Sequence, residues 1–378
     1  MIYLDNAATS FPKPPRVAER MCEYINQVGA TINRSVYGTA REAGLVTLQL
    51  RERLCRVLGY GGRPTHVILT SGCTMSLNLA IRGWLREGDH CIVSSMEHNA
   101  VMRPLTQMGI EFDRIPCDET GLLNPADIVP FIRPNTRLLV MAHGSNVSGA
   151  VQDAEAVGRI CKKYGIPFVL DAAQTAGHVP VDFDHFGCSA LAVPGHKGLL
   201  GPSGIGALLI SPDFAKGLSP IVTGGTGSAS HTELQPLFLP DRFESGTPNL
   251  PGIYGWEAAL EWWESKGLQN LHSRDRALSV RFLNGLRDIP GVRLAGPTDP
   301  DRRVSVFSLD FPGQDNAMVG DRLEQEFGIL TRCGLHCAPH AHKVLGTFPR
   351  GTVRFSFGWS TTEDDVDAAL DAIRRIQL

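Results

Sequence analysis

The sequence predicts an α/β protein, in which a large domain with a mostly parallel sheet and helices on both faces precedes a smaller α+β domain. Two observations support this prediction. Short apolar runs alternate with helical patterns over the first two-thirds of the chain, and the run at 137–142 (RLLVMA) is apolar throughout, as in a strand buried on both faces. Residues 217–251 then become rich in Gly, Pro and Ser, and the pattern changes after them.

Helices and strands alternate in the first part of the chain. Val17, Met21, Ile25 and Val28 recur at helical spacing, so a helix is expected over residues 13–28. Mostly parallel sheets covered by helices bind ligands beyond the carboxyl ends of their strands, so residues that follow the strands are candidates for a site. Further helices are expected at 43–58, 74–86 and 153–164, and strands at 66–70, 90–95, 112–115, 137–142, 166–170, 189–193 and 205–210.

The last third has a different order of elements. Thr362 and Asp365 form a plausible capping pair at the start of a final helix. We expect a large domain over 1–262 and a small domain over 263–378, with about the first 14 residues free to pack against the small one. The elements expected before that helix are helices at 255–266, 268–286 and 316–327 and strands at 304–309 and 352–357.

Composition excludes several classes of protein. The 378 residues are 43% hydrophobic and 20% charged, with a net charge of −3, which argues against disorder and against binding to nucleic acid or a membrane surface. No apolar run approaches the roughly 20 residues of a membrane span, and the start MIYLDNAATS lacks the pattern of a signal peptide. Nine scattered cysteines argue against a disulfide framework and favour a reducing cytoplasm.

Two residues that follow apolar strands could hold a cofactor. Lys197 lies in PGHKGLLGPSGIG, where the glycines allow a ligand to approach the backbone closely. A lysine amine can form a Schiff base with pyridoxal phosphate, although most lysines in such loops are simply solvated. Asp171 ends an apolar strand, where its carboxylate could pair with a protonated pyridine nitrogen or cap the following helix.

Two other strand ends carry candidate groups. In TSGCT (70–74) a strand, a glycine turn and a helix start follow one another, so backbone N–H groups and Thr74 could bind a phosphate or merely cap the helix. His98 follows the next strand. Its ring could stack on an aromatic ligand, move protons, or have a structural role.

The segment RCGLHCAPHAHK (332–343) contains two cysteines and three histidines. It could bind a metal, but no two cysteines have C-x-x-C spacing, so we favour a reactive thiol over a metal site. Cys337 would then act from a mobile loop between Gly334 and Pro339, unless it is simply a small buried residue. Arg354 is the only charged residue in an apolar strand, so its side chain is expected to pair with a carboxylate, either of a substrate or of a structural ion pair.

Together and in this order, the motifs resemble the aminotransferase class V family of pyridoxal-phosphate enzymes, and within it the cysteine desulfurases and selenocysteine lyases. The short RCGLHCAP loop is similar to that of the SufS-like branch. The matching segments run from about residue 2 to 376: YLDNAATSFPKP, TSGCT, MEH, HGSNVSG, LDAAQ, PGHKGLLGPSGIG, RFESGTPN and RCGLHCAP.

The resemblance implies a fold type I enzyme that uses pyridoxal 5'-phosphate and acts as a homodimer. Its substrate would be L-cysteine or L-selenocysteine. With L-cysteine it would release L-alanine and form a persulfide on Cys337. The persulfide sulfur would pass to an acceptor protein, for a pathway such as iron–sulfur cluster assembly.

The resemblance also implies roles for single residues. Lys197 would hold the cofactor and abstract the α-proton, Cys337 would attack the substrate sulfur, and His98 would stack on the ring and be a candidate for moving protons. The other residues implied around the cofactor are Asp171 at the pyridine nitrogen, Gln174 at the ring oxygen, and Thr74, Cys73, His196 and the other subunit's Thr247 near the phosphate. Those implied around the substrate are Asn146, Arg332, Tyr37 and, at its carboxylate, Arg354.

Three departures from the family pattern leave the substrate open. Pro194 stands where the family usually has serine, and Cys73 where a threonine or small polar residue is common, so two phosphate contacts are lost or weakened. Backbone N–H groups, Thr74 and Thr247 are expected to hold the phosphate instead. Tyr37 stands where many desulfurases have a histidine. Selenocysteine lysis, another C–S lyase reaction and transamination remain alternatives, as does a metal-binding or sulfur-carrier protein without catalysis.

Overall fold

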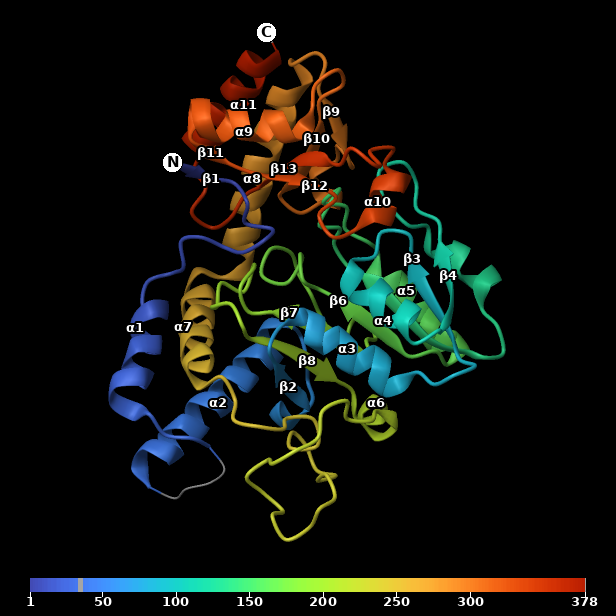
Figure 1. Cartoon of the computed structure of the whole chain (residues 1–378), viewed down its shortest axis with the longest axis vertical. Coiled ribbons are helices and arrows are strands. Elements are labelled where there is room, and N and C mark those ends of the chain that lie inside the picture. Colours follow the sequence, from blue (N-terminus) through green and yellow to red (C-terminus); the bar gives the residue numbers. More distant parts are fainter. Residues whose placement is uncertain (33–36, 378) are drawn as a thin grey trace.

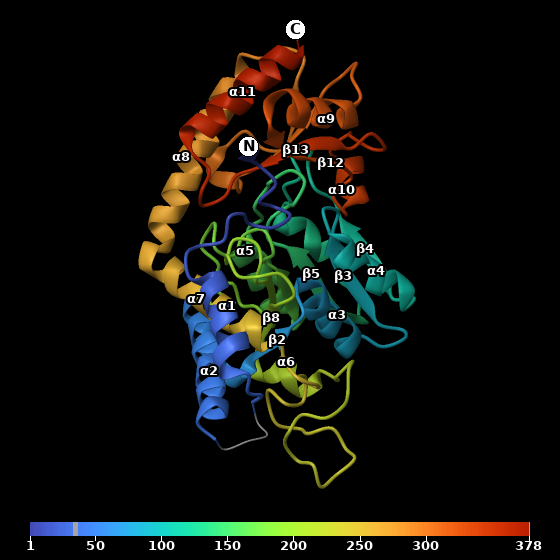
Figure 2. The same ribbon diagram turned by 60° about the vertical axis from the view of Figure 1, so that its left-hand side comes forward.

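The computed structural model describes residues 1–32 and 37–377. They form a seven-stranded sheet and a four-stranded sheet, one in the lower and one in the upper part of Figure 1. The long helix α8 (Leu268–Arg287) follows α7 (Leu250–Lys266) and runs up beside the smaller sheet, next to α11 (Glu363–Gln377) (Figure 2). In the described part of the chain, no helix combines the length and apolar character needed to span a membrane.

The seven-stranded sheet is mostly parallel, as the sequence predicts. Its order is β2-β8-β7-β6-β5-β3-β4, and only β8 runs antiparallel to its neighbours. The parallel strands therefore direct their carboxyl ends to one edge. The strands are β2 (Val67–Thr70), β3 (His90–Ser94), β4 (Glu111–Ile115), β5 (Thr136–Ala142), β6 (Phe168–Asp171), β7 (Ala190–Pro194) and β8 (Gly206–Ile210).

Helices cover both faces of this sheet because its central strands are apolar on both sides. In β5, Leu138 and Val140 pack in one core, whereas Leu139 and Met141 pack in the other. The first core also contains side chains of α3 (Cys73–Trp84) and α4 (Asn99–Gln107). The second contains side chains of α2 (Gly38–Val57), α5 (Ala154–Tyr164) and α7.

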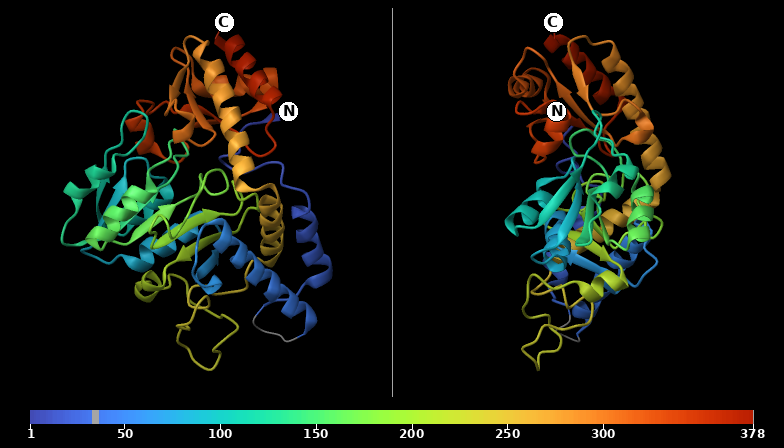
Figure 3. Two further views of the ribbon diagram at one scale, coloured as in Figure 1. Left: turned by 180° about the vertical axis from the view of Figure 1, so that it is seen from behind. Right: turned by 90° about the vertical axis from the view of Figure 1, so that its right-hand side faces the viewer.

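The four-stranded sheet is antiparallel in the order β12-β13-β10-β9. Phe282 of α8 packs there against Phe307, Phe355 and Phe357, so aromatic rings make much of this core. The elements are β9 (Arg293–Ala295), β10 (Val306–Asp310), β12 (Arg332–Gly334), β13 (Thr352–Ser356) and the helices α8, α9 (Asn316–Phe327) and α11. Figure 3 shows this unit from behind and from the side.

The chain begins beside this smaller sheet. Strand β1 (Ile2–Tyr3) pairs in parallel with β11 (Ile329–Leu330), and the backbone of Asp5 forms an isolated parallel β-bridge with that of Ser356. The expected cap of the last helix is present, since Thr362 Oγ1 accepts from Asp365 N (3.1 Å) and Asp365 Oδ2 accepts from Thr362 N (2.8 Å).

Several short elements were not predicted. Elements of two to six residues give too little periodicity to predict, and the short strands take their hydrogen bonds from other segments. One of them, α10 (Pro339–Val344), begins at Pro339, where the predicted mobile loop ends. Residues 24–28 are π-helical rather than α-helical. The others are β1, β9, β11, β12 and α6 (Pro212–Gly217). Helix α1 spans only Val17–Glu23.

One carboxyl group is buried where the strands end. Glu97 follows β3, and its side chain is 2% exposed. Its Oε1 accepts hydrogen bonds from Ser94 Oγ and from Ala142 N (3.0 Å), while Oε2 has no partner among the described residues. Burial raises the pKa of Glu97 to about 8, so the carboxyl group is protonated at neutral pH.

This raised pKa predicts that Glu97 makes stability depend on pH. The unfolded glutamate loses its proton near pH 4.5, whereas the folded one keeps it up to about pH 8, so stability is lost as pH rises between these values. Glu97→Gln removes this titration. Its free energy of unfolding, relative to wild type, should increase by about 3 kcal/mol between pH 5 and pH 8. Denaturation of both proteins at the two pH values measures this change, and a pH-independent difference would contradict it.

Candidate active site

A cavity of about 280 Å³ lies at the carboxyl ends of the parallel strands. Strands β3, β5, β6 and β7 bring four segments to it, because parallel strands end at the same edge of a sheet. Eight predicted residues line it: Cys73, Thr74, His98, Asn146, Asp171, Gln174, His196 and Lys197. Ser71 and Ser203 also line it and were not predicted, although each stands in a motif singled out in the sequence.

Lys197 lies in a tight turn after β7. The turn is closely packed: a methyl group at Gly198 would lie 2.3 Å from Ala176 O, so only glycine fits there. Burial lowers the pKa of Lys197, and the nearby Asp171 carboxylate partly opposes this shift. A lowered pKa increases the share of neutral amine, which is the form that attacks an aldehyde.

Asp171 is the last residue of β6, and its side chain is buried. Its Oδ1 accepts from Ala173 N (2.9 Å) and from the thiol of Cys73 (3.4 Å). Turns rather than a helix follow β6, so Asp171 does not have the helix-capping role considered from the sequence. Oδ2 has no hydrogen bond from the described residues. Burial raises the pKa of Cys73 well above its usual value, and Asp171 adds to the rise, so Cys73 is a protonated donor to Asp171.

Two histidines line the cavity with a ring nitrogen to spare. His98 caps α4, since Nδ1 accepts from Ala100 N (3.0 Å), which leaves Nε2. Burial lowers the pKa of His98. His196 Nδ1 is buried without a partner among the described residues, and burial lowers the pKa of His196 to about 4. Both imidazoles are therefore neutral and able to accept or donate a hydrogen bond.

The start of α3 faces the same cavity. Gly72, Cys73 and Thr74 line it, and the N-cap residue Gly72 gives the helix no side-chain cap. The free N–H groups of an uncapped helix start and the helix dipole favour an anion. Gln174 also lines the cavity, and its Nε2 donates to Ala7 O (3.1 Å).

These groups fit pyridoxal phosphate. The chain offers an amine with a lowered pKa, a buried carboxylate with one oxygen free of hydrogen bonds, an unpartnered histidine nitrogen and an uncapped helix start. The amine matches the aldehyde of that cofactor, the carboxylate matches the protonated ring nitrogen, and the histidine nitrogen and the helix start match the phosphate.

Arg354 connects the cavity wall to the N-terminus. It is 1% exposed, and Nη2 pairs with Asp5 Oδ1 (2.6 Å) while Nη1 donates to Asn146 O (3.2 Å). The structural ion pair considered from the sequence is thus present. Its Nε has no partner among the described residues, so the guanidinium keeps donors for a second carboxylate.

Cys337 lies between β12 and α10 and is exposed. Its Sγ is 3.8 Å from Arg332 Nη2, and its carbonyl accepts from Asn99 N (2.8 Å), the residue after His98. This bond holds the thiol turn beside the cavity. Cys333 is half-buried, its thiol donates to Asn316 O (3.4 Å), and burial raises its pKa to about 11.

The Cys/His segment is not arranged as a metal site. Across the described residues, no three His, Cys, Asp or Glu side chains converge as metal ligands would. His336 is instead hydrogen-bonded to Thr352 Oγ1 (3.0 Å), and His342 to Thr347 Oγ1 (2.7 Å).

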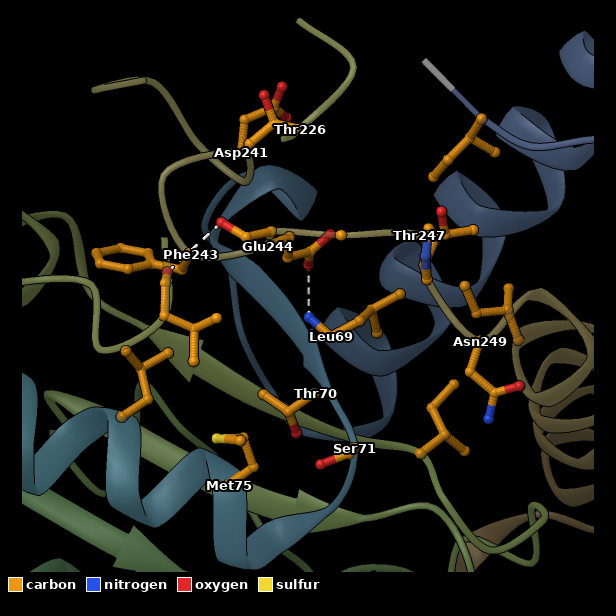
Figure 4. A pocket seen from close by; sticks show the side chains of 18 of the residues that line it. Leu69, Thr70, Ser71, Met75, Thr226, Asp241, Phe243, Glu244, Thr247 and Asn249 are labelled. Atoms are coloured by element: carbon orange, nitrogen blue, oxygen red, sulfur yellow. Dashed lines mark hydrogen bonds between the residues drawn. The ribbon is translucent and has the colours of Figure 1, made fainter. Parts of the chain in front are cut away.

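A second cavity, of about 340 Å³, adjoins the first and shares Ser71, Met75 and Gly204 with it. Thr247 lines this cavity and not the first (Figure 4). Its segment is fixed by Glu244, which accepts from Leu69 N (2.6 Å) and pairs with Arg51 (2.7 Å). Tyr37 is 53% exposed and is not among the residues that line either cavity.

The sequence is similar to those of known proteins over its full length. It is 32% identical to a "Probable cysteine desulfurase" of Pyrococcus abyssi, over 100% of this chain and 94% of that protein. It is 30% identical to a "Cysteine desulfurase" of Cronobacter sakazakii, over 100% of this chain and 93% of that protein. Some relatives are longer: the chain spans 62% of a "Probable cysteine desulfurase 1" of Mycobacterium leprae, at 31% identity.

Solved structures show the same fold. The apo structure of a cysteine desulfurase from Thermococcus onnurineus has a TM-score of 0.92 at 31% identity, covering 99% of this chain and 94% of that one. A cysteine desulfurase from Escherichia coli has a TM-score of 0.87 at 29% identity, with the same coverage of 99% and 94%.

The match to a family extends over almost the whole chain. Residues 2–369 match the family described as aminotransferase class-V. This family and its cysteine desulfurases are pyridoxal-phosphate enzymes. The fold, the residues gathered at the strand ends and this match agree, and the chain therefore belongs to the aminotransferase class-V family.

Proposed function

We propose that the protein is a cysteine desulfurase that uses pyridoxal phosphate. One observation carries the proposal: an exposed thiol, that of Cys337, is hydrogen-bonded through its backbone to Asn99, next to the cavity residue His98. A transaminase has no need of a thiol at this place. The similarity to proteins named cysteine desulfurase supports the same conclusion.

Six residues of one chain would hold the cofactor. Lys197 would bind its aldehyde carbon covalently, the Asp171 carboxylate would pair with its ring nitrogen, and His98 would stack on its ring. When bound, pyridoxal phosphate supplies an electron sink for negative charge that develops at the α-carbon of an amino acid. We assign Gln174 to the ring oxygen, and Thr74, the backbone N–H groups at the start of α3 and His196 to the phosphate end.

The chain's own groups would then carry out the reaction. Arg354 and Asn146 bind the substrate carboxylate. The substrate amine would displace Lys197 from the aldehyde carbon, and the freed neutral amine of Lys197 would then take the α-proton. The Cys337 thiolate, whose Sγ lies 3.8 Å from Arg332 Nη2, attacks the substrate sulfur: an S–S bond forms, the C–S bond breaks, and its electron pair stays on carbon. Alanine forms when one proton reaches that carbon and Lys197 returns to the α-carbon the proton that it took. His98 is the candidate to move the first of these protons.

We further propose that the persulfide passes from Cys337 to an acceptor protein and that the enzyme is a cytoplasmic homodimer. All nine cysteines are free, as expected in a reducing compartment. Apolar side chains are exposed along the segment that carries Thr247, and a second copy would cover them. They are Val222, Leu234, Leu237 and Phe238.

Selenocysteine is the second candidate substrate, because only the atom that Cys337 attacks would change. The thiol chemistry and the carboxylate-binding residues would be the same. A sulfur carrier without catalysis is less well supported, since it needs neither the lowered pKa of Lys197 nor the buried carboxylate of Asp171.

An absorbance spectrum of the purified protein, before and after addition of L-cysteine, tests the proposal. We expect the visible band of lysine-bound pyridoxal phosphate, and sulfide and alanine in equal amounts when a thiol reductant is present. A band that shifts without sulfide release would point to selenocysteine or another amino acid. No band after incubation with pyridoxal phosphate would contradict the proposal.

Cys337→Ala is expected to abolish sulfide release from L-cysteine and to keep the absorbance band, because the thiol takes the sulfur but does not hold the cofactor. Cys22→Ala is the matched control, since Cys22 is also exposed but lies on α1. Sulfide release, measured for both variants, should be lost only in the first. Full activity of Cys337→Ala would exclude the proposed role of this thiol.

Thr247 is expected to act in the active site of the other subunit. Thr247→Ala alone should weaken cofactor binding about tenfold, the effect of one lost hydrogen bond to a charged group. Lys197→Ala alone should be inactive. Mixed dimers of the two variants contain one site with both Lys197 and Thr247, so mixing should restore about a quarter of wild-type activity at limiting cofactor. No gain on mixing would contradict a role in trans.

A further inference from the structure

The turn that carries Cys337 has an uncommon backbone conformation. His336 and Cys337 both have positive φ, 48° and 60°. This left-handed region is unfavourable for residues with a side chain, and two such residues in succession persist only where their surroundings hold them. The turn is closed by a bond from Ala338 N to Leu335 O (2.9 Å).

Two cavity-side segments hold the backbone of this turn. Asn146 Nδ2 donates to His336 O (2.5 Å), and Asn99 N donates to Cys337 O (2.8 Å). These bonds fix two carbonyl groups. They do not by themselves fix the direction of the two side chains, which must come from other contacts.

The two side chains have opposite environments. Cys337 is exposed, whereas His336 is 3% exposed and is hydrogen-bonded through Nε2 to Thr352 Oγ1 (3.0 Å). The ring of His336 also packs against that of His342, with centroids 5.5 Å apart. Burial lowers the pKa of His336 to about 2, so its imidazole stays neutral and the bond does not change with pH.

Thr352 connects this contact to the substrate site. It begins β13, the strand that also carries Arg354. Asn146 contacts both the substrate-binding arginine and the thiol turn, since its carbonyl accepts from Arg354 and its side chain donates to His336 O. The buried imidazole thus ties the thiol turn to the strand that we assign to binding the substrate carboxylate.

We propose that His336 is a positioning residue for Cys337. Its buried hydrogen bond to Thr352 fixes the left-handed turn, and so the place of the thiol relative to a substrate held by Arg354. The inference rests on the proposed desulfurase function and deepens it. His336 does not contact the reacting atoms; it acts through the turn.

Three variants of the cofactor-loaded protein test this proposal. Thr352→Val removes the hydroxyl and keeps the shape of the side chain, while His336→Gln keeps a hydrogen-bonding nitrogen close to the place of Nε2. The neighbouring buried pair of His342 and Thr347 supplies the matched control, Thr347→Val. The readouts are kcat and KM for L-cysteine, the cofactor absorbance band, and the pH profile of alkylation of the Cys337 peptide by iodoacetamide.

Thr352→Val is expected to lower kcat at least tenfold, because small misplacements of a reacting group are costly. It should also change the rate of Cys337 alkylation at a given pH more than twofold, while KM and the intensity of the absorbance band change less than twofold. We expect His336→Gln to retain at least a third of wild-type kcat and Thr347→Val to resemble wild type.

The proposal is overturned if Thr352→Val leaves both kcat and the rate of Cys337 alkylation at each pH within twofold of wild type. It is also overturned if Thr347→Val changes them as much, since the effect would then be one of packing. Alkylation needs no turnover. A wild-type protein that releases no sulfide would therefore contradict the proposed function, while the alkylation profiles would still decide the role of His336.

Discussion

The buried guanidinium of Arg354 requires partners, and these partners join three parts of the chain. A charge removed from water is costly unless it is paired and hydrogen-bonded. Asp5 comes from the N-terminus, Asn146 from the segment after β5, and Arg354 itself from the smaller sheet. The hydrogen bond to Asn146 therefore joins the smaller sheet to a strand end of the larger one, while the ion pair with Asp5 ties the N-terminus to the smaller sheet.

The larger sheet contributes the other half of the site by its direction. Its parallel strands are buried on both faces, so their side chains serve packing, and the chemistry lies in the residues that follow them. His98, Asp171 and Lys197 each follow or end a different strand. Burial at this edge lowers the pKa of Lys197 and of His98, which favours the neutral amine and the neutral imidazole.

Local signals were sufficient for the long elements and for most of the cavity. Alternating apolar runs predict the central strands to within about two residues at either end, as for β5, and helix α9 is predicted residue for residue. The motifs around Lys197 and Asp171 also predict residues that share one cavity. The short elements β12 and α10 were missed because three and six residues give too little periodicity, and because β12 takes its hydrogen bonds from β13.

The sequence alone determined the succession of strands and helices along the chain, their apolar faces and the chemical types of the candidate groups, because these depend on periodicity and residue identity. Only the tertiary structure decided that Cys73 faces Asp171, that Thr247 lies in a second cavity, and that Asp5 pairs with Arg354. It also decided the left-handed turn at Cys337. Such contacts join segments far apart in the chain, and hydrogen-bond geometry between them is not encoded in any local pattern.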